Sequence, residues 1–287
     1  MLSIIIPIYN FDITKTVDIL KSQLLKNNIK YEILCYDDNS KKFKEKNSFL
    51  KNQKNIIYKE LDQNIGRAKI RNLLIKNSIY ENLLMLDCDI LINDNNFIKK
   101  YIPYFNTNTV VCGGVNYEKI NKKNNLRFIY GINREVKKSK YRNRNPYRSF
   151  TAFNMLAPKK IFNKLSFYED ISSYGHEDTL LGLDLKNNSV KVVHIDNNII
   201  HLGLDDNLSF IKKTEEGLKN LHQLFSKKNI SNEVKIYKYY YFLKKFKNPM
   251  FYFLKKWCLN KLKKGSNSLI IFDLYKLLYL VTLKEDE

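Results

Sequence analysis

The chain has 287 residues and 44% of them are apolar, so it can bury a substantial core and is not intrinsically disordered. Its formal charge is +21 and its pI is about 9.6, which favours anionic partners such as a polyanion or an anionic membrane. None of the common nucleic-acid-binding motifs occurs, so we expect nucleic acid not to be the main partner.

The cysteines and the apolar segments indicate a compartment. The four cysteines are dispersed and form no Cys-x-x-Cys pair, which predicts reduced thiols and no disulfide. Residues 1–7 lack a basic leader, and the longest apolar candidate, residues 269–283, is interrupted by Asp273 and Lys276. We therefore expect a cytoplasmic protein without a membrane-spanning helix.

The first ninety residues alternate between short apolar runs and segments with helical spacing. We expect strands at residues 2–6, where Pro7 stops the strand, and at 31–36 and 56–61, a fourth strand ending before Asp87, and helices at 13–26 and 64–77. This alternation predicts an α/β fold with a doubly wound, mostly parallel sheet. The absence of Gly-x-Gly-x-x-Gly and Gly-x-x-x-x-Gly-Lys argues against dinucleotide-dependent redox enzymes and P-loop enzymes.

The segment around Asp87 and Asp89 organises the expected site. The two carboxylates follow a buried strand, at the end of the sheet where α/β proteins bind ligands. Residues i and i+2 of an extended segment share a face, so both carboxylates could converge on one divalent ion or its phosphate ligands, with Cys88 facing the core. The alternative is a pair of solvated turn residues or helix caps.

Two further polar segments follow strands. Asp37 and Asp38, followed by Asn39 and Ser40, can accept hydrogen bonds from a base or ribose; a capped turn is the alternative. At the start of the next helix, Gly66 allows close approach, and Arg67 and Arg71, four residues apart, share one face suited to a diphosphate. Solvated basic residues are the alternative there.

In the second half we expect a helix at 97–105, strands at 109–115, 149–156, 190–195 and 199–202, and a helix starting at Pro158. Residues 118–148 are basic and irregular, which suggests an acceptor or lid segment, with a solvated insertion as the alternative. Glu177 and Asp178 begin another helix, where the helix dipole alone would favour acids. His194 and His201 lie near strand ends, and a lone histidine there is usually structural.

These motifs together resemble family 2 glycosyltransferases of the GT-A fold. The resemblance covers about residues 1–205 and rests on six segments in the family's order: residues 3–10, 37–40, 64–72, 87–89, 175–178 and His201. It implies a UDP-sugar or other nucleotide-sugar donor, a divalent metal, Mn²⁺ or Mg²⁺, and inversion at the anomeric carbon.

The resemblance also implies roles for donor-binding residues. Pro7 and Tyr9 would flank the base, and Asp37 or Asp38 would bind uracil or ribose. Arg67 or Arg71, next to Gly66, would approach the diphosphate.

For the metal and the chemistry, the resemblance implies that Asp89 binds the metal directly and that Asp87 binds the ribose or a metal-bound water. His201 matches the histidine that completes the metal site in some relatives. Asp178 matches the catalytic base, and Glu177 would orient donor or acceptor hydroxyls. His176 departs from the family, where many relatives have Trp or another aromatic residue.

The reaction implied by the family requires these residue types. An acceptor hydroxyl attacks the anomeric carbon opposite the departing nucleoside diphosphate, so one carboxylate must accept its proton. A divalent ion and arginine can offset the charge of the leaving group, which then needs no proton. This explains a single base instead of the acid and base pair of a glycoside hydrolase.

The last part of the chain changes in composition. We expect a GT-A domain over residues 1–205 and a basic, aromatic-rich helical extension over 206–287, with helices at 237–246, 249–264 and 269–283. Interleaved aromatic residues and lysines are typical of a helix lying on an anionic bilayer. Packing against the catalytic domain or a second subunit is the alternative.

The resemblance therefore implies a metal-dependent, inverting hexosyltransferase that acts on a glycan or lipid-linked acceptor in the biosynthesis of a bacterial surface polysaccharide. It would be cytoplasmic or peripheral on the inner face of the plasma membrane. The alternatives are a sugar-phosphate nucleotidyltransferase, whose glycine-rich opening loop is absent, and a non-catalytic basic protein that binds glycans or nucleic acid.

Overall fold

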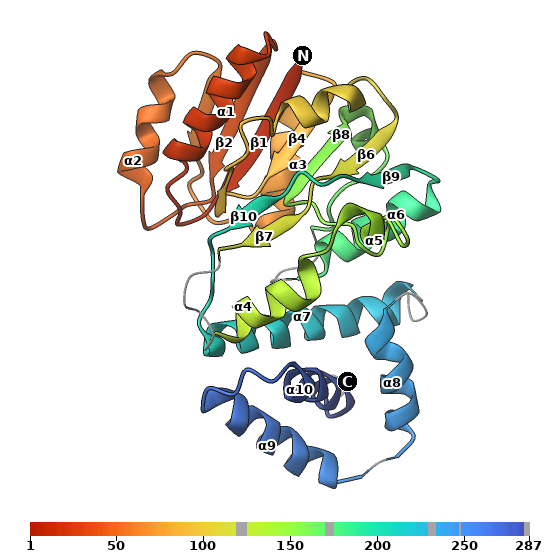
Figure 1. The fold of residues 1–287 in the computed structure, drawn as a ribbon. Coiled ribbons are helices and arrows are strands. Elements are labelled where there is room, and N and C mark those ends of the chain that lie inside the picture. The colour runs from red at the N-terminus through yellow and green to blue at the C-terminus, as the bar shows by residue number, and fades with distance from the viewer. Residues whose placement is uncertain (119–124, 170–174, 229–233, 247, 284–287) are drawn as a thin grey trace. The chain divides into compact units, whose positions relative to one another are not determined.

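A computed structural model describes residues 1–118, 125–169, 175–228, 234–246 and 248–283 (Figure 1). These residues form two compact units, which we describe separately. The first contains residues 1–118, 136–169 and 177–203, and the second contains the remaining described residues. The boundary expected near residue 205 stays a prediction, although the last segment of the first unit ends close to it, at Gly203.

A seven-stranded sheet forms the centre of the first unit, in the order β3-β2-β1-β4-β8-β6-β9. Its strands are β1 (Leu2–Ile8), β2 (Tyr31–Asp37), β3 (Ile56–Glu60), β4 (Asn82–Leu86), β6 (Thr109–Cys112), β8 (Asn154–Pro158) and β9 (Lys191–His194). All neighbours are parallel except β8, which is antiparallel to both β4 and β6. The prediction of a mostly parallel α/β sheet with C-terminal helices is confirmed.

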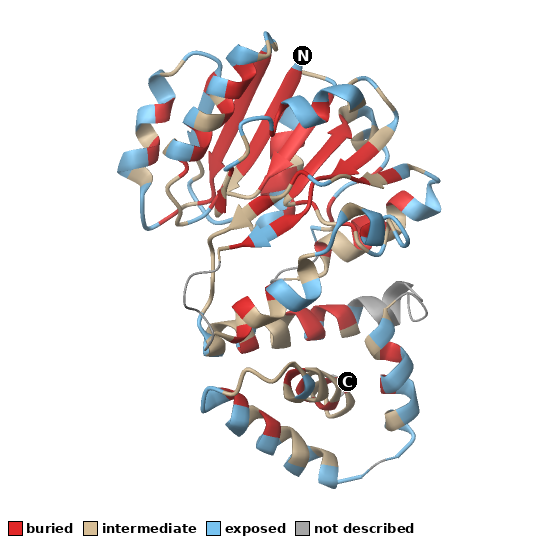
Figure 2. Cartoon of the chain, in the orientation of Figure 1, coloured by how far each residue is buried: buried red, intermediate tan, exposed pale blue. Residues whose placement is uncertain are grey.

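The helices of the first unit cover this sheet (Figure 1). They are α1 (Thr14–Lys26), α2 (Lys44–Ser48), α3 (Arg67–Asn77), α5 (Ser139–Arg142) and α6 (Glu177–Asn187), with short 3₁₀ turns at Phe49–Asn52, Lys99–Tyr104 and Lys159–Asn163. Side chains of α3 and α6 share one apolar cluster with Ile5, Leu34 and Met85. Because both faces of the sheet are covered, nearly all residues of the central strands are buried, as Figure 2 shows, and their sequences are mostly apolar.

Several sequence-based boundaries were wrong: β8 begins at Asn154, not at residue 149, and Pro158 ends this strand before a 3₁₀ turn. β1 continues through Pro7 to Ile8, because β4 pairs with β1 only over Ser3–Ile5 and the missing N–H of Pro7 removes no bond to β4. The strand expected at 109–115 is two strands separated by Gly113 and Gly114. Gly114 has a φ of 95°, and a Cβ on Gly113 would lie 2.4 Å from Tyr101 Oη, so the chain turns where only glycine fits.

The second strand of that pair belongs to a small sheet. β7 (Val115–Tyr117) is parallel to β10 (Ile199–His201), which is antiparallel to β5 (Ile90–Leu91). His201 pairs with Ile90, so this sheet brings the histidine next to the segment that follows β4.

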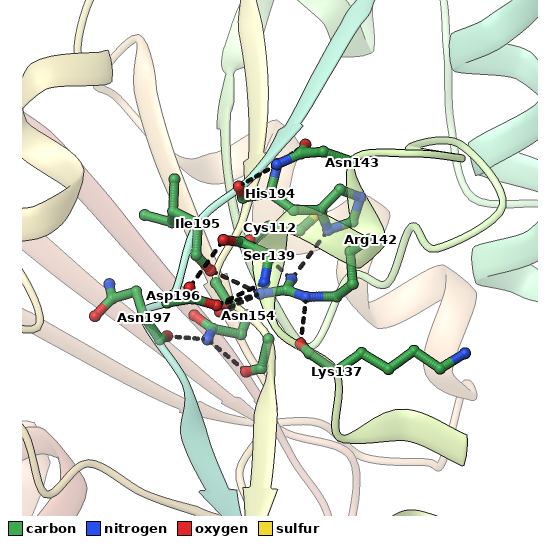
Figure 3. A network of polar contacts seen from close by, with 12 residues as sticks. Cys112, Lys137, Ser139, Arg142, Asn143, Asn154, His194, Ile195, Asp196 and Asn197 are labelled. Atoms are coloured by element: carbon green, nitrogen blue, oxygen red, sulfur yellow. Dashed lines mark hydrogen bonds and ion pairs between the residues drawn. The ribbon is translucent and has the colours of Figure 1, made fainter. Parts of the chain in front are cut away.

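Part of the basic segment expected to act as a lid is fixed to the first unit by Arg142 (Figure 3). The buried guanidinium donates to the carbonyls of Cys112, Gly113, Ile195 and Lys137, over 2.7–3.2 Å, and contacts His194 Nδ1 at 3.0 Å. Asp196 accepts hydrogen bonds from the N–H and hydroxyl groups of Ser139. We call Arg142 and these partners the Arg142 network; it anchors this half of the segment to β9.

The second unit is helical. It contains α4 (Leu126–Tyr130), a π-helical turn (Gly131–Glu135), α7 (Asn207–Lys228), α8 (Lys235–Lys244), α9 (Met250–Lys263) and α10 (Leu269–Val281). α10 contacts α7, α8 and α9 and carries much of the apolar core. Sequence analysis did not define α7 as a helix. None of the helices among the described residues is long and apolar enough to cross a membrane.

Candidate active site

The candidate site lies within the first unit, where β1, β2 and β4 end and where α3 and α6 begin. Ile8 pairs with Asp37 in the sheet, so Tyr9 follows β1 next to the end of β2. The Tyr9 side chain is 51% exposed, so it is free to contact a ligand. Pro7 is partly buried and pairs with Tyr36, the residue before Asp37. Their contact with a base stays a prediction.

Asp37 and Asp38 are both buried and both hold the local backbone. Asp37 accepts from Ser40 N at 2.6 Å and from Tyr58 Oη at 3.4 Å. Asp38 accepts from the N–H groups of Ile65 and Gly66 at 2.7 and 3.0 Å. Burial raises the pKa of Asp38, and Asp37 adds to this effect, while the two backbone donors oppose it. The capped-turn alternative therefore describes their contacts, and binding of uracil or ribose stays a prediction.

Gly66 marks the entry to α3. Its φ is 85°, a conformation that favours glycine, and its N–H points to Asp38. α3 then begins at Arg67, so Arg67 and Arg71 lie one turn apart on the face directed at the site. Arg71 is only 1% exposed, whereas Arg67 is 42% exposed.

The two arginines gather three carboxylates from distant parts of the chain. Arg71 Nη2 lies 2.7 Å from Asp87 Oδ1, and Arg71 Nη1 lies 3.5 Å from both Glu177 Oε1 and Asp178 Oδ1. Arg67 contacts Asp87 Oδ2 at 3.2 Å and Glu177 Oε1 at 3.1 Å. We call these five residues the Arg71 cluster. It joins the end of β4 to the first turn of α6.

The carboxylates of the Arg71 cluster differ in their pKa. Burial alone would raise the pKa of Asp87, but Arg71 and Arg67 outweigh it and the pKa is lowered. The pKa of Glu177 is lowered for the same reason: Arg67 and Arg71 outweigh its burial. Burial raises the pKa of Asp178, the charge of Glu177 adds to this, and Arg71 does not fully offset it. Asp178 is therefore the carboxylate that is best suited to accept a proton.

Asp178 is also the more accessible acid of α6. Its side chain is 25% exposed, against 8% for Glu177. Asp178 Oδ1 contacts Arg71, and Oδ2 accepts from Ala152 N at 3.0 Å, so both oxygens are oriented. Just before α6, Gly175 and His176 have positive φ values of 111° and 70°.

Sequence analysis assigned no role to the residues that support this cluster. Asn72, next to Arg71, accepts from Phe167 N at 3.0 Å and donates to Phe167 O at 2.8 Å. The centre of the Phe167 ring lies 5.2 Å from the Arg71 guanidinium carbon, which is a cation–π contact. The only sequence signal was the position of Asn72 at the end of the Asn64–Asn72 motif.

Asp89 has a different partner from Asp87. β4 ends at Leu86 and β5 begins at Ile90, with a bend at residues 88 and 89, so the expectation of an extended segment there is wrong. Asp87 turns to the arginines, whereas Asp89 Oδ2 lies 3.4 Å from His201 Nε2. Leu202 N donates to Asp89 O at 2.8 Å and fixes this approach.

The Asp89 and His201 pair fits a divalent cation that takes further ligands from a substrate. Carboxylate and imidazole suit Mn²⁺ or Mg²⁺, and the separation of their atoms allows both to contact one ion. His201 Nδ1 is buried without a hydrogen-bond partner. Within the described part of the chain, no group of three or more His, Cys, Asp or Glu residues is placed to hold a metal. Metal binding by Asp89 and His201 stays a prediction.

The other histidine near a strand end has a different role. His194 lies in the Arg142 network, where burial and then the charge of Arg142 lower its pKa to about 4, although a contact with Pro146 O opposes the shift. The four cysteines are free thiols. Burial raises the pKa of Cys88 to about 12, with Asp89 adding to the shift, so this thiol is unreactive at neutral pH.

The chain is similar to a known family of proteins and to two curated sequences. Residues 3–166 match the model of the family described as glycosyl transferase family 2. An uncharacterized glycosyltransferase of Rickettsia felis is 34% identical over 122 residues, and one of Rickettsia conorii is 34% identical over 123 residues. Each alignment covers 42% of this chain and 20% of the relative, so the chain matches about a fifth of the length of these curated relatives.

Solved structures share the fold at low sequence identity. A mannosyltransferase from Pyrobaculum calidifontis, in complex with GDP-Man and Mn²⁺, has a TM-score of 0.57 and 13% identity. That match covers 78% of this chain and 64% of the other. S. aureus TarS 1–349, in complex with UDP, has a TM-score of 0.52 and 17% identity, covering 97% of this chain and 90% of TarS 1–349.

Proposed function

Because the chain belongs to glycosyl transferase family 2, we propose that it is a metal-dependent, inverting glycosyltransferase that moves a sugar from a UDP-sugar to an acceptor hydroxyl. One observation carries this proposal: Asp178, a carboxylate with a raised pKa and an exposed edge, is held by Arg71 beside Asp87 at the carboxyl end of the sheet.

Asp178 is the proposed general base. Arg71 and Ala152 N fix its two oxygens, and the exposed quarter of its side chain leaves room for an acceptor hydroxyl. A positioned base of this kind contributes about 10²–10⁴-fold to the rate. Glu177, with its lowered pKa and two arginine contacts, is a poor proton acceptor and orients Arg67.

The leaving group is a nucleoside diphosphate, whose negative charge needs compensation. Arg67 is the exposed arginine of the cluster, so its side chain can turn to a diphosphate, while the buried Arg71 stays with the carboxylates. Asp37 and Asp38, at the end of β2, would hold the uracil or ribose, and Pro7 and Tyr9 would flank the base. Asp87, beside Arg67, would approach the ribose.

Asp89 and His201 would hold Mn²⁺ or Mg²⁺ against the diphosphate, with Asp87 contacting a bound water. When bound, the ion would neutralise charge on the leaving group. The mannosyltransferase neighbour was solved with GDP-Man and Mn²⁺, and TarS was solved with UDP and with UDP-GlcNAc, which supports a nucleotide-sugar donor without naming the sugar.

We further propose that the acceptor is a glycan or lipid-linked saccharide used for a bacterial surface polysaccharide, and that the protein works on the cytoplasmic side of the plasma membrane. The family and the basic C-terminal helices support this role.

A panel of UDP-, GDP- and other nucleotide sugars tests the proposal. With Mn²⁺ present, the cognate donor should raise the melting temperature, since a ligand that binds only the folded protein stabilises it by mass action. The same donor should release its nucleoside diphosphate when an acceptor is added. No stabilisation by any donor, with or without Mn²⁺, would argue for a protein that keeps the fold without the activity.

A further inference from the structure

The outward side of α8 and α9 has an unusual composition for a helical surface in water. Residues 235–264 contain ten lysines and no aspartate or glutamate. No ion pair can form within this segment, so its positive charge is not internally compensated.

One side of these helices packs in the core of the second unit. Tyr237 and Tyr240 lie in a buried cluster with Leu280, and Cys258 and Leu262 lie in another. The buried residues on this inner side attach α8 and α9 to the rest of the second unit.

The opposite side is also apolar. Its large side chains are 47–74% exposed and are Tyr239, Phe242, Phe246, Met250, Phe253 and Trp257. On α9 the spacing of three and four residues places Met250, Phe253 and Trp257 in one stripe. Figure 2 shows α8 and α9 with mainly exposed residues on this outer side. Phe242 and Phe246 contact each other, with ring centres 5.5 Å apart, but none of the six side chains belongs to either buried cluster.

Lysines border the exposed rings. Lys238, Lys245, Lys256 and Lys261 are exposed, and Lys261 Nζ lies 5.9 Å from the centre of the Trp257 ring. We call these lysines and the six exposed apolar side chains the aromatic–lysine face.

We propose that the aromatic–lysine face docks the protein on an anionic lipid bilayer. Aromatic rings prefer the boundary between headgroups and acyl chains, and lysines are attracted to the negative surface. A second copy of the chain is a poorer occupant, because it would bring the same uncompensated positive charge against this one. The proposal extends the proposed function, because it places the enzyme where a lipid-linked acceptor would lie. The aromatic–lysine face contains no residue of the candidate active site.

Trp257 is the only tryptophan of the chain, so its fluorescence reports on this face in the unmodified protein. Vesicles of phosphatidylcholine with about 30% phosphatidylglycerol should shift its emission to the blue and protect it from acrylamide. Brominated lipids should quench it. Pure phosphatidylcholine vesicles should bind at least tenfold more weakly, and salt should release the protein from the anionic vesicles.

Paired variants locate the surface by vesicle co-sedimentation. The double variant Met250→Ser and Phe253→Ser should lower the affinity for anionic vesicles at least tenfold. Its control, Phe49→Ser and Ile79→Ser, removes two equally exposed apolar residues of the first unit and should change nothing.

The charge is tested in the same way. Lys245→Gln, Lys256→Gln and Lys261→Gln together should weaken binding at least tenfold, whereas Lys41→Gln, Lys42→Gln and Lys54→Gln, which remove the same charge elsewhere, should weaken it less than twofold. Equal losses in the two triple variants would show that diffuse charge acts, and would overturn the proposal.

Absence of Trp257 shifts and sedimentation with anionic vesicles would also overturn it. Self-association that is lost in the Met250 and Phe253 variant, without vesicle binding, would assign the face to a second copy instead. Donor-dependent release of nucleoside diphosphate, measured without vesicles, keeps the two proposals separate. Release without vesicle binding removes only the docking surface, and vesicle binding without release from any donor removes only the transferase.

Discussion

Two arginines of the first unit are almost completely buried, and they differ in what surrounds them. Arg71 meets three carboxylates, whereas Arg142 donates to four backbone carbonyls and lies 3.8 Å from the exposed carboxylate of Asp196. Burial alone would lower the pKa of both. At Arg71 the carboxylates outweigh that effect, and at Arg142 they do not.

The difference distinguishes the arginine of the proposed site from an arginine that only holds the backbone. Carbonyls neither titrate nor move, so the Arg142 network fixes the chain in one geometry. Carboxylates can exchange protons and partners, and Arg67, the exposed neighbour of Arg71, is already shared between two of them. The chemistry of the partners, not the depth of the arginine, indicates where the site lies.

The largest expected effect is on stability at Arg142. Arg142→Met leaves four carbonyls without their donor, and at about 1 kcal/mol for each net hydrogen bond it should lower the free energy of unfolding by about 4 kcal/mol. Urea denaturation measures this loss. Arg144→Met, two residues away and exposed, should change stability by less than about 0.5 kcal/mol. Similar values for the two variants would contradict a structural role of Arg142.

Arg71→Met should lower stability by about 3 kcal/mol near neutral pH, because three carboxylates lose a buried counter-ion while Arg67 remains. Without Arg71 their folded pKa values rise, so the destabilisation is present above those values and shrinks as the pH falls and they take up protons. The loss in Arg142→Met should change little between about pH 6 and about pH 8, since carbonyls do not titrate in that range and the pKa of His194, which Arg142 contacts, is lowered to about 4 mainly by burial. Urea denaturation of both variants at about pH 6 and about pH 8 measures these losses in the free energy of unfolding. If both losses changed equally with pH, the two arginines would not differ in the way described.

Asp178→Asn should lower kcat by at least about a hundredfold while donor affinity stays the same, because the amide cannot accept the proton. Initial rates of nucleoside diphosphate release and donor binding measure the two quantities. Asp184→Asn is the matched control on the same helix, since Asp184 accepts from Tyr168 Oη outside the Arg71 cluster. If the Asp178 variant retained turnover, another carboxylate would be the base.

The same assignment predicts the pH profile. The base works deprotonated, and the pKa of Asp178 is raised, so activity should fall with decreasing pH at a higher value than an ordinary aspartate would give. Arg71 favours the charged form, so Arg71→Gln should move this acid limb to still higher pH. If the acid limb of the pH–activity profile stayed in place in Arg71→Gln, or moved to lower pH, the result would contradict an effect of Arg71 on the pKa of Asp178.

The smallest expected effect is at Gly203. A Cβ there would lie 2.1 Å from Asp89 Oδ2, so Gly203→Ala should push the carboxylate away from His201. We expect Mn²⁺ binding, measured by calorimetry with donor present, to weaken about tenfold, or about 1.4 kcal/mol. The melting temperature should stay unchanged because only a side-chain end moves. Unchanged Mn²⁺ affinity would show that Asp89 does not hold the ion in this orientation.

The sequence by itself determined the fold class and the order of its elements. A short apolar run such as residues 83–86 favours a strand buried on both faces, and the alternation of such runs with helices predicts a mostly parallel sheet. It missed α7, and it merged β6 with β7, because the turn at Gly113 depends on contacts with Tyr101 and Asn154 that are distant in the chain.

For the site, the sequence supplied the candidates and the structure decided their partners. Asp87 and Asp89 look equivalent as a pair two residues apart, yet Asp87 pairs with Arg71 and Asp89 pairs with His201, and the chain bends between β4 and β5. The roles of Asn72 and Phe167 are likewise invisible in sequence spacing. Local patterns specify strands and helices because those depend on near neighbours, whereas the shared charges of the Arg71 cluster exist only after residues about a hundred positions apart have been brought together by folding.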